Sequence, residues 1–234
     1  MKIIECQGCP VRALTSFRSP GPELLTSIDN AKRTNHYKKG QVVFYEGDPA
    51  FGLYCINSGK VKLYKSTSEG KRLILRIANP GDQLGHLALF TDQPYSATGE
   101  ALEDSVICFV DRQCLPHLMS RDSDVTWAVI HGLAAELALT RDRATVIAHS
   151  SVRERMAGLL LQLRTSYGED DADGSVRLDI ALSREDLAEM VGTTKEAAVR
   201  VLSDFRQEKL IKESRRNIVL LSPHRLAEVA GFID

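Results

Sequence analysis

Residues 182–202 read LSREDLAEMVGTTKEAAVRVL, and this stretch decides the fold of the C-terminal part of the chain. Ser183 is placed to cap a first helix, with Asp186 at its third position. Gly192 permits a left-handed turn, and Thr194 then starts a second helix. The pattern of helix, glycine turn and helix predicts a helix-turn-helix. The residues predicted to face inward are Leu187, Met190, Val191, Val199, Leu202 and Phe205.

The second of these helices offers polar side chains on its first turns. Glu196 and Arg200 are four residues apart and share one face, with Lys195 beside them. In the major groove of DNA, an arginine can donate to guanine O6 and N7, and a glutamate can accept from cytosine N4. We therefore expect Lys195, Glu196 and Arg200 to read bases. The alternative is a surface salt bridge on a helical hairpin.

The charge of the chain changes around this helix. The formal net charge of −1 gives no general signature of nucleic-acid binding. Between residues 195 and 216, however, seven Lys or Arg residues stand against four Asp or Glu residues. The basic turn 214–217 lies here between two short apolar runs, which predicts a β-hairpin wing. We expect Arg215 and Arg216 at its tip to contact DNA phosphates.

The region from Tyr37 to about Val110 has a different pattern. Turn signals such as Gly47-Asp48-Pro49 and Asn79-Pro80-Gly81-Asp82 divide it into short β-rich runs. Regular spacing of this kind suggests a barrel or roll. The clearest predicted strands are residues 42–45, 53–56, 61–64 and 73–77.

Turn signals stop after Asp111, and residues 125–149 contain one glycine and no proline, which predicts one long helix. Apolar or small residues recur on it at alternating spacings of three and four, as in the seam of a two-stranded coiled coil. A helix packed on its own domain is the alternative. The seam residues are Ile130, Leu133, Leu137, Thr140, Ala144 and Ile147. A shorter helix is predicted at 152–165, with Ser151 and Glu154 as a capping box, and the acidic segment 168–174 is predicted to be a solvated connector.

The composition fits an ordinary globular chain of two domains. The 234 residues are 43% hydrophobic and 26% charged, with no signal-peptide pattern and no run of about 18 apolar residues. We expect an α+β protein in the cytoplasm, without a membrane segment. The expected parts are a cysteine-containing arm (1–22), a β-roll sensor domain (23–115), a dimerisation helix region (116–149) and a winged helix-turn-helix (150–234).

The order of roll, long helix and winged helix-turn-helix, with GTTKEAAVRVL at 192–202, resembles the Crp/Fnr family of transcription regulators. The resemblance implies a cyclic-nucleotide-binding-like roll and a homodimer on pseudo-palindromic double-stranded DNA. It also implies RNA polymerase as a partner, and phosphate contacts from Ser183 and Thr194. Val199 stands where Fnr-type members have a base-contacting serine, which favours a TGTGA-like half-site.

Residues 79–98 resemble the phosphate-binding cassette of the cyclic-nucleotide members. In those members an acidic residue holds the ribose and an arginine holds the cyclic phosphate, whereas His86 and Tyr95 occupy these places here. No Lys or Arg occurs between Arg76 and Arg112, so a buried phosphate would lack a cation. Cyclic AMP is therefore not expected to bind. The candidate effector pocket consists of His86, Leu87, Tyr95 and Ser96.

The five cysteines suggest other signals. Cys6, Cys9 and Cys108 match ligands of the [4Fe–4S] cluster in Fnr-like members, but the third N-terminal ligand would fall at Thr15. Cys55 and Cys114 are expected to be buried small hydrophobes. Four modes remain open: a cluster completed by a non-thiol ligand, a thiol switch at the first two cysteines, haem or another small effector near His86 or His36, and no effector at all.

Two other classes of protein are rivals. One is a cupin-like enzyme, but the roll has no cluster of His and carboxylates with metal-ligand spacing, and no nucleophile stands near a base. The other is a ligand-regulated subunit of a channel or kinase, but neither a membrane span nor a kinase motif occurs. We therefore expect a regulator and not an enzyme.

Overall fold

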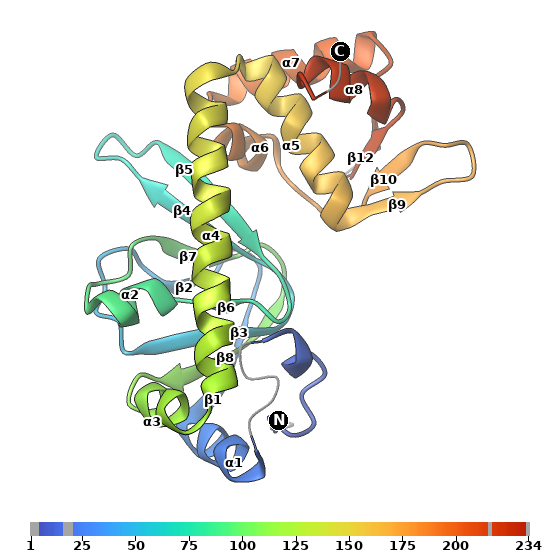
Figure 1. Ribbon diagram of the computed structural model, residues 1–234. Helices are drawn as coiled ribbons and strands as arrows, with labels where there is room; N and C mark the ends of the chain where they lie inside the picture. Colours follow the sequence, from blue (N-terminus) through green and yellow to red (C-terminus); the bar gives the residue numbers. More distant parts are fainter. Residues whose placement is uncertain (1–4, 16–20, 215–216, 233–234) are drawn as a thin grey trace. The chain divides into compact units, whose positions relative to one another are not determined.

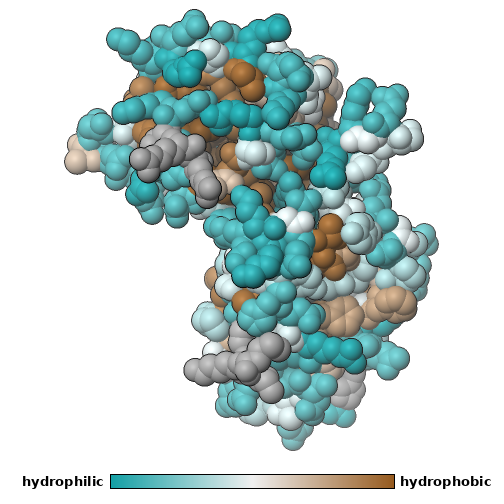
Figure 2. Space-filling model, turned by 180° about the vertical axis from the view of Figure 1, so that it is seen from behind, coloured by the Kyte–Doolittle hydropathy of each residue, from teal (hydrophilic) through white to brown (hydrophobic). Residues whose placement is uncertain are grey.

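The structure is a computed structural model that describes residues 5–15, 21–214 and 217–232 (Figure 1). It is an α+β fold made of two compact units, the first comprising the chain up to Leu139 except for Lys71–Ile74, and the second comprising that short segment and the chain from Thr140 onward. Hydrophilic side chains cover most of the face shown in Figure 2, and hydrophobic atoms appear there in smaller areas. Among the described residues, no helix combines the length and the apolar character needed to span a bilayer.

The first unit is built around two four-stranded sheets. In spatial order, one sheet contains β1 (Lys32–Tyr37), β8 (Ser105–Asp111), β3 (Gly52–Ser58) and β6 (Gln83–Leu84). The other contains β2 (Val42–Phe44), β7 (Thr98–Ala101), β4 (Val61–Ser66) and β5 (Arg72–Ala78). The four strands predicted from the sequence are confirmed as β2 to β5. The prediction missed β1, whose polar sequence KRTNHY gives no strand pattern and which owes its conformation to antiparallel pairing with β8.

Aromatic rings fill the centre of this roll. The ring of Tyr95 lies 4.5 Å from that of Phe44 and 6.1 Å from that of Tyr54, measured between centroids. Apolar side chains such as Ile56 and Ile107, both fully buried, complete the cluster. The core therefore joins side chains from both sheets.

Five helical segments belong to or leave this part of the chain. They are a short 3-10 turn (Arg12–Leu14), α1 (Pro22–Ala31), α2 (His86–Thr91), α3 (Cys114–Arg121) and α4 (Ser123–His149). Ile28 of α1 and Val125 of α4 pack with Val110 of β8 in a second buried cluster. The long helix predicted at 125–149 is thus confirmed, and its first turn is anchored in the core of the first unit.

The second unit packs four helices with a small sheet. The helices are α5 (Val152–Tyr167), α6 (Arg184–Val191), α7 (Lys195–Gln207) and α8 (Pro223–Val229), and the strands in spatial order are β11 (Ile211–Ser214), β12 (Asn217–Leu220), β10 (Val176–Leu178) and β9 (Gly168–Asp170). The predicted capping box of α5 is confirmed: the backbone N–H of Glu154 donates to Ser151 Oγ at 3.2 Å, and that of Ser151 donates to Glu154 Oε2 at 2.6 Å.

The acidic segment 168–174 is only partly the connector that was predicted. Its first three residues form β9, which pairs antiparallel with β10. All three side chains are exposed, so the segment is solvated as expected. The prediction missed the strand because backbone hydrogen bonds to β10 hold it, and its polar side chains leave no apolar alternation.

Candidate nucleic-acid interface and sensor sites

The turn between α6 and α7 has the geometry predicted for a helix-turn-helix. Ser183 and Asp186 form a reciprocal capping box, with the backbone N–H of each donating to the side chain of the other at 2.9 and 3.0 Å. Gly192 ends α6 in the left-handed region at φ +69°, where a side chain would be strained. Thr194 Oγ1 then caps α7 by accepting from the backbone N–H of Ala197 at 3.3 Å. These local interactions fix the angle at which α7 leaves α6.

Helix α7 has one buried and one exposed face. Ala198, Leu202 and Phe205 are buried at spacings of four and three residues, as a helix packed on a core requires. The prediction that Val199 packs inward is wrong: its side chain is 45% exposed, because the inward position is taken by Ala198, one residue or about 100° away. Val199 therefore belongs to the outer face.

That outer face contains the three side chains predicted to read bases. Lys195, Glu196 and Arg200 are all exposed on the first turns of α7, beside Val199. Lys195 Nζ lies 3.9 Å from Glu185 Oε2 of α6, a loose surface contact. Among the ion pairs of the described residues, none joins Glu196 to Arg200, although the surface salt bridge was the alternative interpretation of that pair.

The wing predicted after α7 is a β-hairpin. Strands β11 and β12 pair antiparallel, with Ser214 opposite Asn217. Arg184 of α6 forms an ion pair with Glu213 of β11 at 2.8 Å, which ties the hairpin to the helix-turn-helix. The predicted phosphate contacts Arg215 and Arg216 lie outside the described residues. Ser183 and Thr194, the other predicted phosphate contacts, are exposed at the starts of their helices.

The predicted seam of α4 presents apolar side chains to solvent in the single chain. Ile130, Leu137 and Ile147 are 46%, 52% and 47% exposed. Leu133 is half-buried, and Thr140 and Ala144 are exposed. Three large apolar side chains half-exposed on one helix form a surface that association with another chain would cover.

The four residues predicted as an effector pocket differ in their surroundings. Tyr95 is buried in the roll core, where burial raises its pKa, and its hydroxyl donates to the carbonyl of Gly52 at 2.7 Å. His86 Nε2 lies 3.0 Å from Glu136 Oε2 of α4. Leu87 is 48% exposed and Ser96 is also exposed. The described residues therefore offer a cyclic phosphate no free tyrosine hydroxyl at this place.

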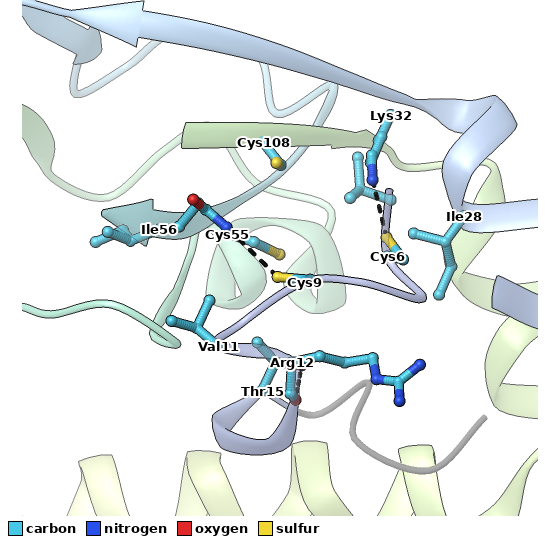
Figure 3. Close-up of a pocket in the computed structure, with 12 residues that line it drawn as sticks. Cys6, Cys9, Val11, Arg12, Thr15, Ile28, Lys32, Cys55, Ile56 and Cys108 are labelled. Atoms are coloured by element: carbon cyan, nitrogen blue, oxygen red, sulfur yellow. Dashed lines mark hydrogen bonds between the residues drawn. The ribbon is translucent and has the colours of Figure 1, made fainter. Parts of the chain in front are cut away.

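A different cavity lies between the N-terminal arm and the first sheet (Figure 3). It is lined by four cysteines, namely Cys6 and Cys9 from the arm, Cys55 from β3 and Cys108 from β8. Thr15, the residue matching the missing third ligand, also lines it, and its hydroxyl donates to the carbonyl of Arg12 at 2.8 Å. The structure thus brings together the three cysteines predicted as ligands.

Cys55 is the residue of this cavity that sequence reasoning missed. Cys55 packs against the second core cluster, as expected of a small hydrophobe, and it also lines the cavity, directly opposite Cys108 across the pair of strands. Only the register of β3 against β8 reveals this, and 46 residues lie between these two strands in the sequence. Cys114, assigned in the same way, is half-buried beside the second core cluster.

Each of the four thiols has a polar partner. Lys32 Nζ donates to Cys6 Sγ at 3.2 Å, and Asn57 Nδ2 donates to Cys9 Sγ at 3.4 Å. Gln83 Nε2 donates to Cys55 Sγ at 3.8 Å, and the Thr34 hydroxyl lies 3.6 Å from Cys108 Sγ. Burial raises the pKa of Cys6 to about 11 and, together with the neighbouring Cys108 sulfur, that of Cys55 to about 12. Without a bound cation these two thiols are therefore protonated at neutral pH.

A roll joined by a long helix to a winged helix-turn-helix, with an exposed polar face on its second helix, defines a DNA-binding regulator. Comparison with known proteins agrees with this class. Residues 34–122 match the family profile of the cyclic nucleotide-binding domain, and residues 154–229 match that of the Crp-like helix-turn-helix domain. The chain belongs to the Crp/Fnr family of transcriptional regulators.

Relatives extend over nearly the whole chain. A CRP-like cAMP-activated global transcriptional regulator of Mycobacterium tuberculosis is 26% identical, covering 92% of this chain and 95% of that protein. The fumarate and nitrate reduction regulatory protein of Vibrio cholerae is 25% identical, covering 97% of this chain and 91% of its own. The solved structure of FixK2 from Bradyrhizobium japonicum superposes with a TM-score of 0.74 at 26% identity, covering 85% of this chain and 96% of that one.

Proposed function

We propose that the chain acts as a cytoplasmic homodimer that binds a pseudo-palindromic DNA site and contacts RNA polymerase, with no enzymatic activity of its own. The exposed polar face of α7 is the observation on which the proposal depends. Lys195, Glu196 and Arg200 project from the first turns of a helix whose opposite face is buried, so all three can enter a major groove at once. Two copies would place these faces about one DNA turn, roughly 34 Å, apart.

The parts of the chain have distinct roles in this proposal. Residues 1–22 and 23–115 form the signal-receiving arm and roll, residues 116–149 form the dimer region, and residues 150–234 bind DNA. The half-exposed apolar side chains of α4 support dimerisation. Because α4 starts in the core of the first unit and runs on into the second, a change at the roll can reach the DNA-binding part through this helix.

Cyclic AMP does not fit as the effector. The ring of Tyr95 packs against Phe44 and Tyr54, and its hydroxyl donates to a backbone carbonyl, so this side chain is not available to hold a phosphate. His86 is engaged with Glu136. We propose instead that the signal acts at the cavity lined by Cys6, Cys9 and Cys108, which favours an iron–sulfur cluster or thiol chemistry over haem.

Substitution of Arg200 tests the DNA-reading assignment. One arginine-to-guanine contact is worth about 1–3 kcal/mol. A symmetric dimer loses two such contacts, or at least about 2 kcal/mol, so Arg200→Ala should weaken specific DNA binding by at least about 30-fold. Specific and non-specific duplexes are compared by fluorescence anisotropy, with the specific site first selected from a random library with the wild-type protein.

Arg206→Ala is the matched control. Arg206 is exposed on the same helix, six residues and about 9 Å further along its axis, and has the same charge. The Arg206→Ala substitution should lower the affinities for specific and non-specific DNA equally, and only slightly. Unchanged specific affinity in Arg200→Ala, with the dimer intact, would refute the assignment of α7 as the base-reading helix.

A further inference from the structure

Four thiols from three separate parts of the chain surround one cavity (Figure 3). Cys6 and Cys9 lie on the arm, which is held in place because the backbone N–H of Cys6 donates to Asp29 Oδ1 of α1 at 2.8 Å. Cys55 and Cys108 lie opposite each other on β3 and β8. The arm and the sheet thus each contribute two sulfurs.

The polar partners of these sulfurs point to a metal-bound state. Lys32, Asn57 and Gln83 each direct an N–H group at a different sulfur, and the buried ammonium of Lys32 also forms an ion pair with Asp29 of α1. A neutral buried thiol needs no such donors, since it behaves as a small hydrophobe. Thiolates that bind iron keep much of their negative charge, and hydrogen bonds to the sulfurs stabilise that charge and set the potential of the cluster.

The four cysteines that line this cavity match the number of thiolate ligands that a cubane cluster takes. A zinc ion needs its four ligands to converge on one point, with Zn–S distances of about 2.3 Å. In the part of the chain that the structure describes, no group of three or more His, Cys, Asp or Glu side chains is already arranged as metal ligands. A cubane cluster instead takes one thiolate at each of four separate irons.

We propose that Cys55 is the fourth thiolate ligand of a [4Fe–4S] cluster held with Cys6, Cys9 and Cys108, in place of a ligand at Thr15. This inference rests on the proposed function, because it names the signal group of the regulator. The Thr15 hydroxyl is engaged with the Arg12 carbonyl, and a hydroxyl is a weaker ligand for iron than a thiolate. When bound, the cluster would supply an oxygen- or redox-sensitive link between arm and sheet.

Loading of the cluster into the cavity does not change the oxidation state of iron or sulfur. A preformed [4Fe–4S] core bearing four small-molecule thiolates exchanges them one by one for cysteine sulfurs. At each iron one bond to the external sulfur breaks and one bond to a cysteine sulfur forms. The proton of the cysteine thiol passes to the departing thiolate, so atoms, charge and electrons balance.

The experiment loads the full chain anaerobically with the 2-mercaptoethanol-ligated cluster. Iron, sulfide and zinc are then measured for the wild type, Cys55→Ser, Thr15→Ala and Cys114→Ser. The wild type should hold four irons and four sulfides per protomer. After gel filtration, Cys55→Ser should hold at least tenfold less iron and sulfide than the wild type. Thr15→Ala and Cys114→Ser should hold as much as the wild type. Cys114→Ser is the matched control because this cysteine lies outside the cavity.

Several results would overturn the inference. One is that Cys55→Ser holds the full amount of iron and sulfide while Thr15→Ala loses them. The others are that the wild type binds a single zinc ion in place of iron, or that it binds no metal. If Cys55→Ser does not fold, the Mössbauer spectrum of iron-57-loaded wild type decides, because an oxygen ligand makes one iron distinct from three thiolate-bound ones. Specific DNA binding is measured on the same samples, and its absence in every variant would count against the proposed function independently of the metal content.

Discussion

Leu137→Asp in α4 tests the dimer seam. Leu137 is 52% exposed in the single chain. Burying a leucine fully stabilises by about 1.5–3 kcal/mol, so covering the remaining half contributes about 0.8–1.5 kcal/mol. A symmetric seam counts the residue twice, so loss of the apolar contact alone should weaken the dimer by about 1.5–3 kcal/mol, or roughly 10- to 140-fold in Kd. The aspartate adds the desolvation of two like charges across the seam, which makes this range a minimum.

Sedimentation velocity over a range of protein concentrations gives the dimer Kd. Leu139→Asp is the matched control: it is the same substitution two residues further on, at a side chain that is 59% exposed and about 200° around the helix. It should remain dimeric at concentrations where Leu137→Asp is monomeric. Dissociation of Leu139→Asp alone would place the seam on another face of α4, and two fully dimeric variants would show that α4 does not hold the dimer.

Two further predictions concern stability. Ser151→Ala removes the cap of α5 and should lower the free energy of unfolding by about 0.5–2 kcal/mol, measured in urea titrations followed by circular dichroism. Ser151→Asp is the control, because aspartate should retain the cap. Equal urea midpoints for the alanine variant and the wild type would contradict the prediction. The hydrogen bond with His86 holds the pKa of Glu136 below its ordinary value of 4.5. The ionised carboxylate therefore stabilises the fold above pH 4.5, and this contribution is lost as the pH falls through the lower folded pKa. Glu136→Gln should flatten the acid side of the stability profile, and an unchanged slope would show that the pair does not contribute.

Elements whose structure depends on local interactions were predictable from the sequence. Both capping boxes, the glycine turn at Gly192 and the start of α7 at Thr194 depend on residues within four positions of one another. The long helix α4 and the four strands β2 to β5 were also predictable, because apolar periodicity and turn residues are local patterns. The family resemblance followed from these elements in their order along the chain.

Some side-chain directions could not be predicted from spacing alone. The apolar pattern of α7 allows either Val199 or Ala198 to face the core. Only the packed core shows that Ala198, the smaller residue, is buried. Tyr95 occupies the place of a phosphate-binding arginine in the sequence, yet its ring fills the centre of the roll. In both cases the volume available in the core decides, and that volume belongs to the assembled fold.

By itself, the sequence determined the order of the elements, the helix-turn-helix and the three polar residues at the start of its second helix, because each depends on neighbours in the chain. Only the tertiary structure decided which cysteines meet. Cys55 and Cys108 are 53 positions apart in sequence and become neighbours through the register of β3 and β8, and the arm adds Cys6 and Cys9 by docking beside them. A site assembled from distant segments leaves no local pattern, since its geometry is set by strand pairing and packing.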